Sequence, residues 1–238
     1  MKDDKHMNTN QQAATTMASS RKIAIAAGVF YLLTFVSIPT LALYGPVHEP
    51  NYILGPGPDT AVIFGGFLEI IVALAGIGTA VALYPVVKRQ NEGVALGFVA
   101  ARVLEAGIIF AGVVSLLAVV TLRRAGAGAD ALVTGQALVA LYDRFFLGQG
   151  LLPAVNALLL GYLLYQSRLV PRILPVLGFI GAPLLVASSV ATLFGANEYG
   201  SGLSGLAALP IALWEFSLGV WLIARGFNPS ATASGSVQ

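Results

Sequence analysis

The sequence predicts an all-α fold, a polytopic bundle of six transmembrane helices. The 238-residue chain is 57% hydrophobic and only 10% charged, whereas soluble domains carry about 45–50% apolar and about 25% charged residues. So few charges could not cover the surface of a water-soluble fold. The apolar residues also form long blocks, each near or above the ~20 residues that cross a bilayer as a helix. The expected surroundings of this protein are therefore a lipid bilayer.

The chain begins with a polar segment followed by a first apolar block. Residues 1–20, MKDDKHMNTNQQAATTMASS, lack hydrophobic periodicity and are typical of a disordered tail. The first span is expected over residues 22–44. Its apolar run is longer than the 7–15-residue core of a secretory signal and starts later in the chain. We therefore interpret it as a retained span.

Five further apolar blocks predict spans over residues 61–87, 94–121, 145–166, 173–194 and 205–224. Sequences rich in glycine, proline and charged residues separate the blocks: GPVHEPNYILGPGPDT, KRQNEG, RRAGAGAD, SRLVPR and GANEYGSG. The membrane domain would then cover residues 21–227, and residues 228–238 would form a second disordered tail.

Residues 131–166 are apolar for too long to form one ordinary span. Asp143 and Arg144 interrupt this stretch, shortly before Gly148 and Gly150. One interpretation is an extra interfacial or partly re-entrant helix over residues 130–142, with Asp143 and Arg144 at the outer boundary of the bilayer. The alternative is a single long, tilted fourth helix. The sequence leaves both open.

The distribution of lysine and arginine predicts the orientation, because basic residues gather in cytoplasmic loops. With the N-terminus inside, seven basic residues near the span ends lie on the cytoplasmic side and two lie opposite. We therefore expect a multi-pass protein of the plasma membrane with both termini in the cytoplasm. The seven are Arg21, Lys22, Lys88, Arg89, Arg168, Arg172 and Arg225, and the two are Arg123 and Arg124.

Several classes of function lack the residues that they need. The chain has no cysteine, which excludes disulfides and thiolate chemistry, and its two histidines, His6 and His48, lie outside the apolar blocks. We therefore expect no metal site and no cofactor. The net charge of +2 comes from scattered basic residues, which argues against nucleic-acid binding. Nothing in the sequence indicates an oligomeric state.

Charged and strongly polar residues inside the spans form the candidate functional site. A charge at the centre of a bilayer costs at least ~2.5–3.5 kcal/mol on insertion scales, so each one needs a partner or a role. Two of them, an arginine and a glutamate three positions apart, are neighbours on one helix face. From a rise of about 1.5 Å per residue, we predict that five such residues meet in one layer: Glu69, Arg102, Glu105, Asn156 and Glu215.

Three glutamates against one arginine leave two negative charges uncompensated. We therefore expect one or two of the glutamates to be protonated at neutral pH, or a cation to occupy the cluster. The leading hypothesis is a protein that handles a proton, a cation or a small polar solute.

Two other hypotheses stay open. In a structural or partner-binding protein, the cluster would only hold helices together, since interhelical hydrogen bonds contribute about 0.6–2 kcal/mol. In a membrane-embedded lipid-modifying enzyme, two carboxylates would act as acid and base. No nucleophile motif accompanies the carboxylates, so the sequence favours a protein that is not an enzyme.

The sequence resembles the domain-of-unknown-function 4386 family over roughly residues 21–227. The resemblance is carried by GFLEIIVALAGIGTAVALYPVVKR, GFVAARVLEAG, VNALLLGYLLYQSRLVPRILPVLGFIGAPLL and LPIALWEFSLGVWLIARGF. It implies a bacterial multi-pass inner-membrane protein, and it marks the acidic positions Glu69, Glu105 and Glu215 and the basic position Arg102. It implies no substrate, because no activity is established for that family.

Overall fold

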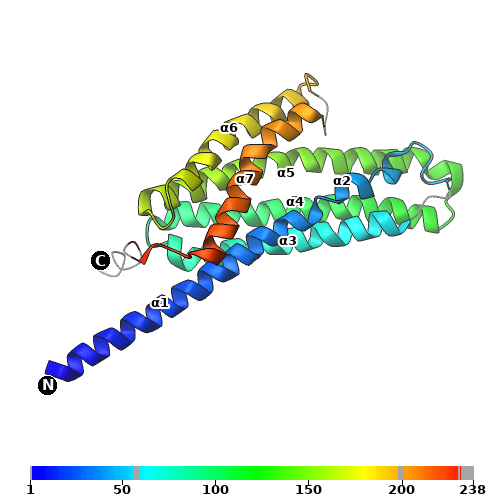
Figure 1. Ribbon diagram of the computed structural model, residues 1–238. Helices are drawn as coiled ribbons and strands as arrows, with labels where there is room; N and C mark the ends of the chain where they lie inside the picture. Colours follow the sequence, from blue (N-terminus) through cyan, green and yellow to red (C-terminus); the bar gives the residue numbers. More distant parts are fainter. Residues whose placement is uncertain (1, 56–58, 198–200, 230, 232–238) are drawn as a thin grey trace.

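Six long helices, consecutive along the chain, pack side by side in a closed ring in the computed structural model, which describes residues 2–55, 59–197, 201–229 and 231 (Figure 1). Each long helix packs against its neighbours in sequence, and the last packs back against the first. The long helices are α1 (Lys2–Leu33), α3 (Asp59–Val87), α4 (Glu92–Arg124), α5 (Leu132–Ser167), α6 (Ile173–Leu193) and α7 (Gly202–Ala224).

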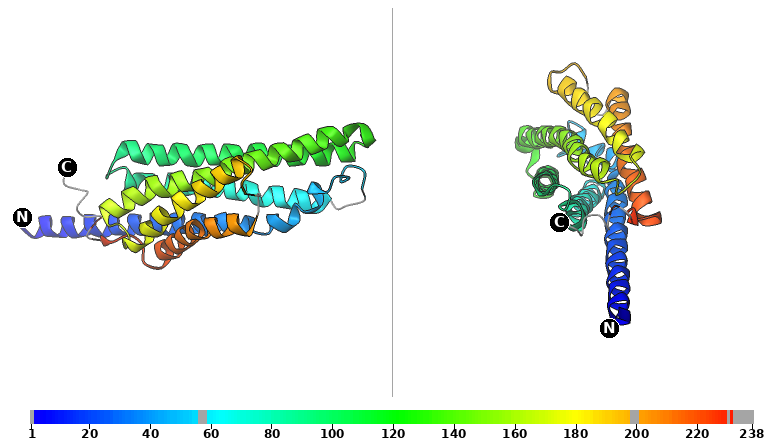
Figure 2. Two further views of the ribbon diagram at one scale, coloured as in Figure 1. Left: turned by 90° about the horizontal axis from the view of Figure 1, so that it is seen from above. Right: turned by 90° about the vertical axis from the view of Figure 1, so that its left-hand side faces the viewer.

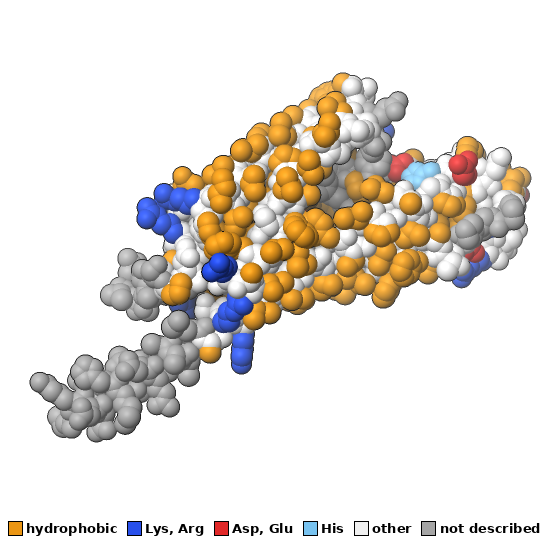
Figure 3. Space-filling model, viewed as in Figure 1, with side chains coloured by type: hydrophobic (Ala, Val, Ile, Leu, Met, Phe, Trp, Pro, Cys, Tyr) orange, Lys and Arg blue, Asp and Glu red, His pale blue; other side chains and the backbone are white. Residues whose placement is uncertain are grey.

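Six segments are long and apolar enough to cross a membrane, which confirms the predicted all-α fold with six spans. They are Ala18–Leu43, Asp59–Val87, Glu92–Arg124, Gly128–Ser167, Ile173–Leu193 and Gly202–Ala224. Exposed hydrophobic side chains cover the visible flank of the ring, as expected for a surface in contact with lipid (Figure 3).

The helix ends use ordinary capping chemistry. Asn91 accepts a hydrogen bond from the Val94 backbone N–H at 3.1 Å, and Ser201 accepts one from Ser204 at 3.2 Å, which satisfies N–H groups that the first turn leaves free. Gly126 and Gly195 follow α4 and α6 with φ values of 67° and 72°, the left-handed conformation that ends helices and that glycine adopts without strain.

The first span is broken, which the sequence prediction did not anticipate. After α1 the chain continues as η1 (Thr34–Ser37) and the single turn α2 (Thr40–Leu43). Pro39 lies between them and lacks the backbone N–H that a continuous helix would need. The expected span of residues 22–44 is therefore not one helix, and both η1 and α2 pack against α3.

The terminal segments bear on the predicted domain boundaries. Helix α1 begins at Lys2 and runs through the segment that was expected to be a disordered tail. The extent of α1 does not decide where the membrane domain begins or ends, so the domain boundaries at residues 20 and 227 stay predictions. Most of the predicted tail over residues 228–238 lies outside the described residues.

The fourth span is one continuous helix. The short η3 (Gly128–Ala131) leads directly into the 36-residue α5. Of the two interpretations of residues 131–166, the single long helix is the one that the structure shows, and the separate interfacial helix is wrong. Pro153 lies inside α5 without ending it.

The two ends of the ring differ. At the basic end, where α3 joins α4 and α5 joins α6, Arg21 donates to the carbonyl oxygens of Leu222 and Ile223 at 3.0 and 2.5 Å and so ties α1 to the C-terminus of α7. At the loop end, where α4 joins α5 and α6 joins α7, the α6–α7 pair diverges from α3, α4 and α5 (Figures 1 and 2). This divergence leaves space inside the ring.

Candidate functional site

Arg102 on α4 is the centre of a buried charge cluster. Its guanidinium donates from Nη1 to Glu105 Oε2 at 3.0 Å and from Nη2 to Glu215 Oε1 at 2.5 Å. Asn156 Nδ2 donates to the same Glu105 oxygen at 2.8 Å. Only 3% of the Arg102 side chain is exposed. The contacts define the Arg102 cluster, which consists of Arg102, Glu105, Asn156 and Glu215.

Local sequence explains how these four residues reach one another. Arg102 and Glu105 lie three positions apart on α4, so their side chains project from one face of the helix. Glu215 arrives from α7 and Asn156 from α5. The planar fork of the arginine lets it bind two carboxylates on different helices at once. The predicted meeting of these four residues is therefore present in the structure.

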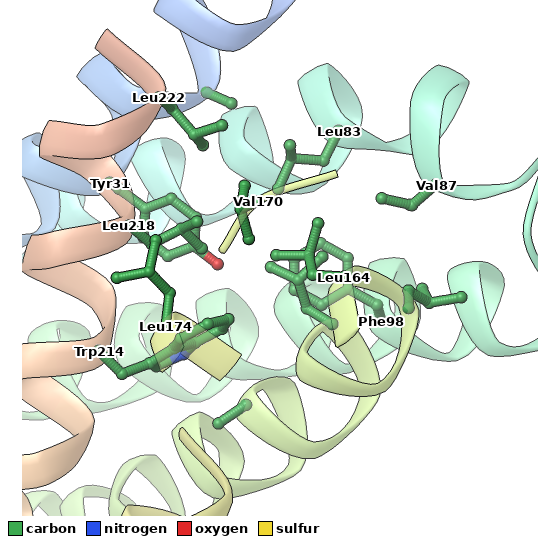
Figure 4. Close-up of a cluster of buried hydrophobic side chains, with 14 of the residues drawn as sticks. Tyr31, Leu83, Val87, Phe98, Leu164, Val170, Leu174, Trp214, Leu218 and Leu222 are labelled. Atoms are coloured by element: carbon green, nitrogen blue, oxygen red, sulfur yellow. The ribbon is translucent and has the colours of Figure 1, made fainter. Parts of the chain in front are cut away.

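Towards the basic end, the ring interior is filled by large apolar side chains (Figure 4). We call this packing the basic-end core; its members include Tyr31, Leu83, Phe98, Leu164, Trp214 and Leu218. The Arg102 guanidinium lies over two of its rings, 5.4 Å from the centroid of Tyr31 and 5.9 Å from that of Phe98. Both distances allow cation–π attraction. The cluster thus rests directly on a closed apolar layer.

Towards the loop end, the ring interior is a cavity of about 440 Å³. Arg102, Glu105 and Glu215 line it together with apolar residues from α3, α4, α5, α6 and α7. The hollow is visible between α6–α7 and the rest of the molecule (Figure 3). Since the basic-end core closes the other side, the Arg102 cluster forms the floor of this cavity.

Several polar atoms at this level have no hydrogen-bond partner among the described residues: Arg102 Nε, Asn156 Oδ1 and Gln149 Nε2. Gln149 lines the cavity. Buried polar groups in native proteins are nearly always paired. Arg102 Nε and Gln149 Nε2 are thus unpaired donors, and Asn156 Oδ1 is an unpaired acceptor, on residues in or next to the cavity lining.

Glu69 does not belong to the Arg102 cluster, which corrects the prediction that all three glutamates meet. Its carboxylate accepts hydrogen bonds from Tyr142 at 2.9 Å and from Tyr44 at 3.2 Å. Gly76 on α3 faces Arg102, since a Cβ there would lie 3.9 Å from Arg102 Cδ. Glu69 lies seven residues, or roughly 10 Å, further along α3 towards the loop end.

The sequence prediction missed the two tyrosines of Glu69. Their rings pack edge to face with centroids 5.4 Å apart, and they come from the loop after α2 and from α5. Tyr44 ends the expected span of residues 22–44, where tyrosine commonly serves as an interface anchor. No sequence signal pairs it with Glu69, although Tyr142 directly precedes the conspicuous Asp143.

A contact between His48 and Asp143 connects α5 to the first loop, the segment between α2 and α3. His48 Nε2 lies 3.1 Å from Asp143 Oδ1, and Nδ1 lies 2.7 Å from the Tyr44 carbonyl oxygen. Both ring nitrogens face acceptors, which only the protonated imidazolium satisfies fully. The hydrogen bond to Asp143 accordingly raises the pKa of His48.

A group of small polar residues lies at the loop end between α6 and α7 and was also missed. Asn197 Nδ2 donates to Ser204 Oγ at 2.7 Å, and Ser201 Oγ donates to Asn197 Oδ1 at 2.8 Å. Ser201 and Ser204 line the cavity. The spacing S-x-x-S at the start of α7 is a capping signal that could have indicated them.

The Arg102 cluster has more acidic than basic groups. With both carboxylates ionised, one arginine and two glutamates give a net charge of −1. Over the residues that the structure describes, no three His, Cys, Asp or Glu side chains gather in a way that could hold a metal ion. The cluster can therefore accept hydrogen bonds and one positive charge from the cavity side.

A family model described as a domain of unknown function (DUF4386) matches residues 26–226, which include most of the first span and the whole of the other five. Comparison with curated proteins gave no match, and comparison with solved structures gave none.

Proposed function

The chain belongs to the DUF4386 family, a domain of unknown function, and we propose that it binds a proton, a cation or a small polar solute at the Arg102 cluster and carries it through the membrane. One observation carries the proposal. Two carboxylates share a single arginine at the floor of a cavity, directly against a closed apolar layer. A buried excess charge is costly in a bilayer, and one bound proton or monovalent cation neutralises it.

We also propose that the protein lies in the plasma membrane with the basic end in the cytoplasm. Seven lysine and arginine residues flank the spans on that side, against Arg123 and Arg124 at the loop end, and basic residues favour the cytoplasm. The cavity then opens towards the outer leaflet. The chain has no cysteine, so single cysteines at Arg89 and Asn197 can report the two sides by labelling with a membrane-impermeant maleimide.

The transport proposal is tested by charge-neutralising substitutions. Glu105→Gln and Glu215→Gln, each purified and reconstituted in liposomes with an internal pH indicator, are expected to keep their thermal stability but to change the size and pH dependence of proton or cation flux. Glu69→Gln is the matched control, because it alters a buried carboxylate outside the cluster. Unchanged flux in both cluster variants overturns the proposal.

A structural role is the second candidate, and a specific observation favours it. The Arg102 cluster joins α4 to α7 through the Arg102–Glu215 hydrogen bond and α4 to α5 through the Asn156–Glu105 hydrogen bond. If it only holds helices together, Glu105→Gln and Glu215→Gln both lower the thermal stability, and neither alters any flux. The same two variants therefore decide between the two functions.

A further inference from the structure

We infer that the cavity binds a single-chain amphiphile with a protonated amine head, which enters from the lipid between α2 and α7. The inference deepens the proposed function and rests on it, because the amine would occupy the same carboxylates. It names the class of molecule and the route by which that molecule reaches the site.

The charges of the cavity floor select the head group. Glu105 Oε2 accepts hydrogen bonds from Arg102 and Asn156, and Glu215 Oε1 accepts one from Arg102. The second oxygen of each carboxylate receives no hydrogen bond from the described residues, and both side chains line the cavity. An ammonium group offers three donors and one positive charge. It therefore complements two free acceptors and the net charge of −1.

The walls above the floor select an apolar tail. Val72, Ala106 and Ile109 line one side of the cavity, and Leu147, Leu185 and Ile211 line the other. An alkyl chain contacts such walls much as it contacts the lipid, so it can leave the bilayer for the cavity without crossing water. A fully hydrated small ion gains nothing from them. The volume of about 440 Å³ falls in the range of about 300–1,000 Å³ that holds drug-sized ligands, which favours one chain.

The cavity opens through the wall of the ring, between α2 and α7, and not at one end of it. Phe35 of η1 packs edge to face against Phe216 of α7, with centroids 5.6 Å apart, beside Glu215. Beyond this pair, α2 and α7 diverge towards the loop end (Figure 1). Leu41 on α2 lines the cavity and is nevertheless 74% exposed. A residue with both properties marks the mouth.

Exposed residues of the cavity lining come from both elements that flank the mouth. Leu41 is one, and Gly205 on α7 also lines the cavity and is exposed. A molecule already dissolved in the bilayer would enter directly, head group leading towards the Arg102 cluster.

The test uses the full chain in lipid nanodiscs and two photoreactive probes. One is a dodecylamine with a diazirine at the end of its chain, and the other is the matching dodecanol. Cross-linked peptides are mapped by mass spectrometry. We expect the amine to label residues 146–153 and 202–215 about tenfold more than the alcohol, and we expect Glu215→Gln to abolish that preference. Equal labelling by both probes, or labelling confined to the outer flank, overturns the inference.

A second variant tests the inference without changing the Arg102 cluster, so the test still works if the cluster variants misfold. Leu41→Trp narrows the mouth and leaves the Arg102 cluster intact, and it should lower amine labelling at the cavity. Leu96→Trp places the same bulk at an exposed position on α4 that does not line the cavity, and it should change nothing. Equal labelling of the Leu41 and Leu96 variants overturns the route between α2 and α7.

The failures of the two proposals can be told apart. If methylamine or proton flux depends on Glu215 while dodecylamine neither binds nor competes, the inference fails and the proposed function stands. If no flux and no labelling depends on Glu215, both fail.

Discussion

Arg102 on α4 and Glu215 on α7 form a largely buried ion pair between residues 113 positions apart, with 2.5 Å between Nη2 and Oε1. The pair lies where the ring interior changes from the basic-end core to the cavity. Because the same arginine also binds Glu105, a change at one member alters the charge balance of all. Several measurable consequences depend on this arrangement and on the contacts around it.

Arg102→Met is expected to be the most destabilising single substitution in the cluster. It leaves the buried Glu105 and the partly buried Glu215 without a counter-ion, and removing one partner of a buried pair typically costs about 3–5 kcal/mol. Thermal unfolding in detergent, followed by loss of monodisperse protein, measures the effect. The combination of Arg102→Met with Glu105→Gln and Glu215→Gln removes every charge and should recover most of the stability. No recovery would show that the arginine acts mainly through its packing on Tyr31 and Phe98.

Tyr142→Phe should destabilise the protein through Glu69. The substitution removes one of the two hydroxyl donors of a buried carboxylate, a loss of about 1–3 kcal/mol. Once Glu69→Gln is present, the same substitution should cost less, because the charged acceptor is gone. A double-mutant cycle of thermal stabilities measures this coupling, and additive effects would contradict the hydrogen bond.

Arg123 should hold the first loop in place, whereas Arg124 should not. Arg123 binds Asp59 at 2.9 Å and the Gly55 carbonyl oxygen at 2.6 Å, and it lies 4.6 Å over the Tyr52 ring. Arg124 also binds Asp59, but 59% of its side chain is exposed, and exposed ion pairs contribute about 0–1 kcal/mol. Arg123→Gln should therefore speed hydrogen exchange over residues 46–55 clearly more than Arg124→Gln. Equal rates would contradict the difference.

The contact of His48 with Asp143 should weaken as the pH rises. The hydrogen bond to Asp143 raises the pKa of His48 above the value of about 6.5 that it has when unfolded. Its contribution to stability is then fully present below pH ~6.5 and is lost as the pH rises through the raised pKa. The melting temperature should fall over that window in the unaltered protein and stay flatter in His48→Gln. The effect is small, since both side chains are about one-third exposed.

Gly28→Ala should weaken the closure of the ring. A Cβ at Gly28 would lie 2.6 Å from the Gly219 carbonyl oxygen of α7, and backbone atoms cannot easily move aside. Overpacking of this kind costs about 1–3 kcal/mol. Gly107→Ala is the matched control, because nothing lies within 4 Å of its Cβ and alanine favours a helix interior by about 0.5–1 kcal/mol. Thermal stability should fall in the first variant and rise in the second.

The basic features of the fold could be predicted from local patterns. Apolar blocks of bilayer length predict spans wherever they occur, because lipid forces each backbone to satisfy its hydrogen bonds within one helix. The same patterns missed the break at Pro39 and left residues 131–166 open. A proline near a span end is compatible with either outcome, and a long apolar stretch can lie along or across the bilayer.

By itself, the sequence determined that the chain is a six-span membrane protein and that Arg102 and Glu105 share one helix face, since both depend on residues close together in the chain. Only the tertiary structure decided which distant groups meet. It brings Glu215 and Asn156 to Arg102 and gives Glu69 to Tyr44 and Tyr142 instead. Depth along a span can be counted from residue number, but the direction of a side chain around the bundle depends on how the helices pack against one another.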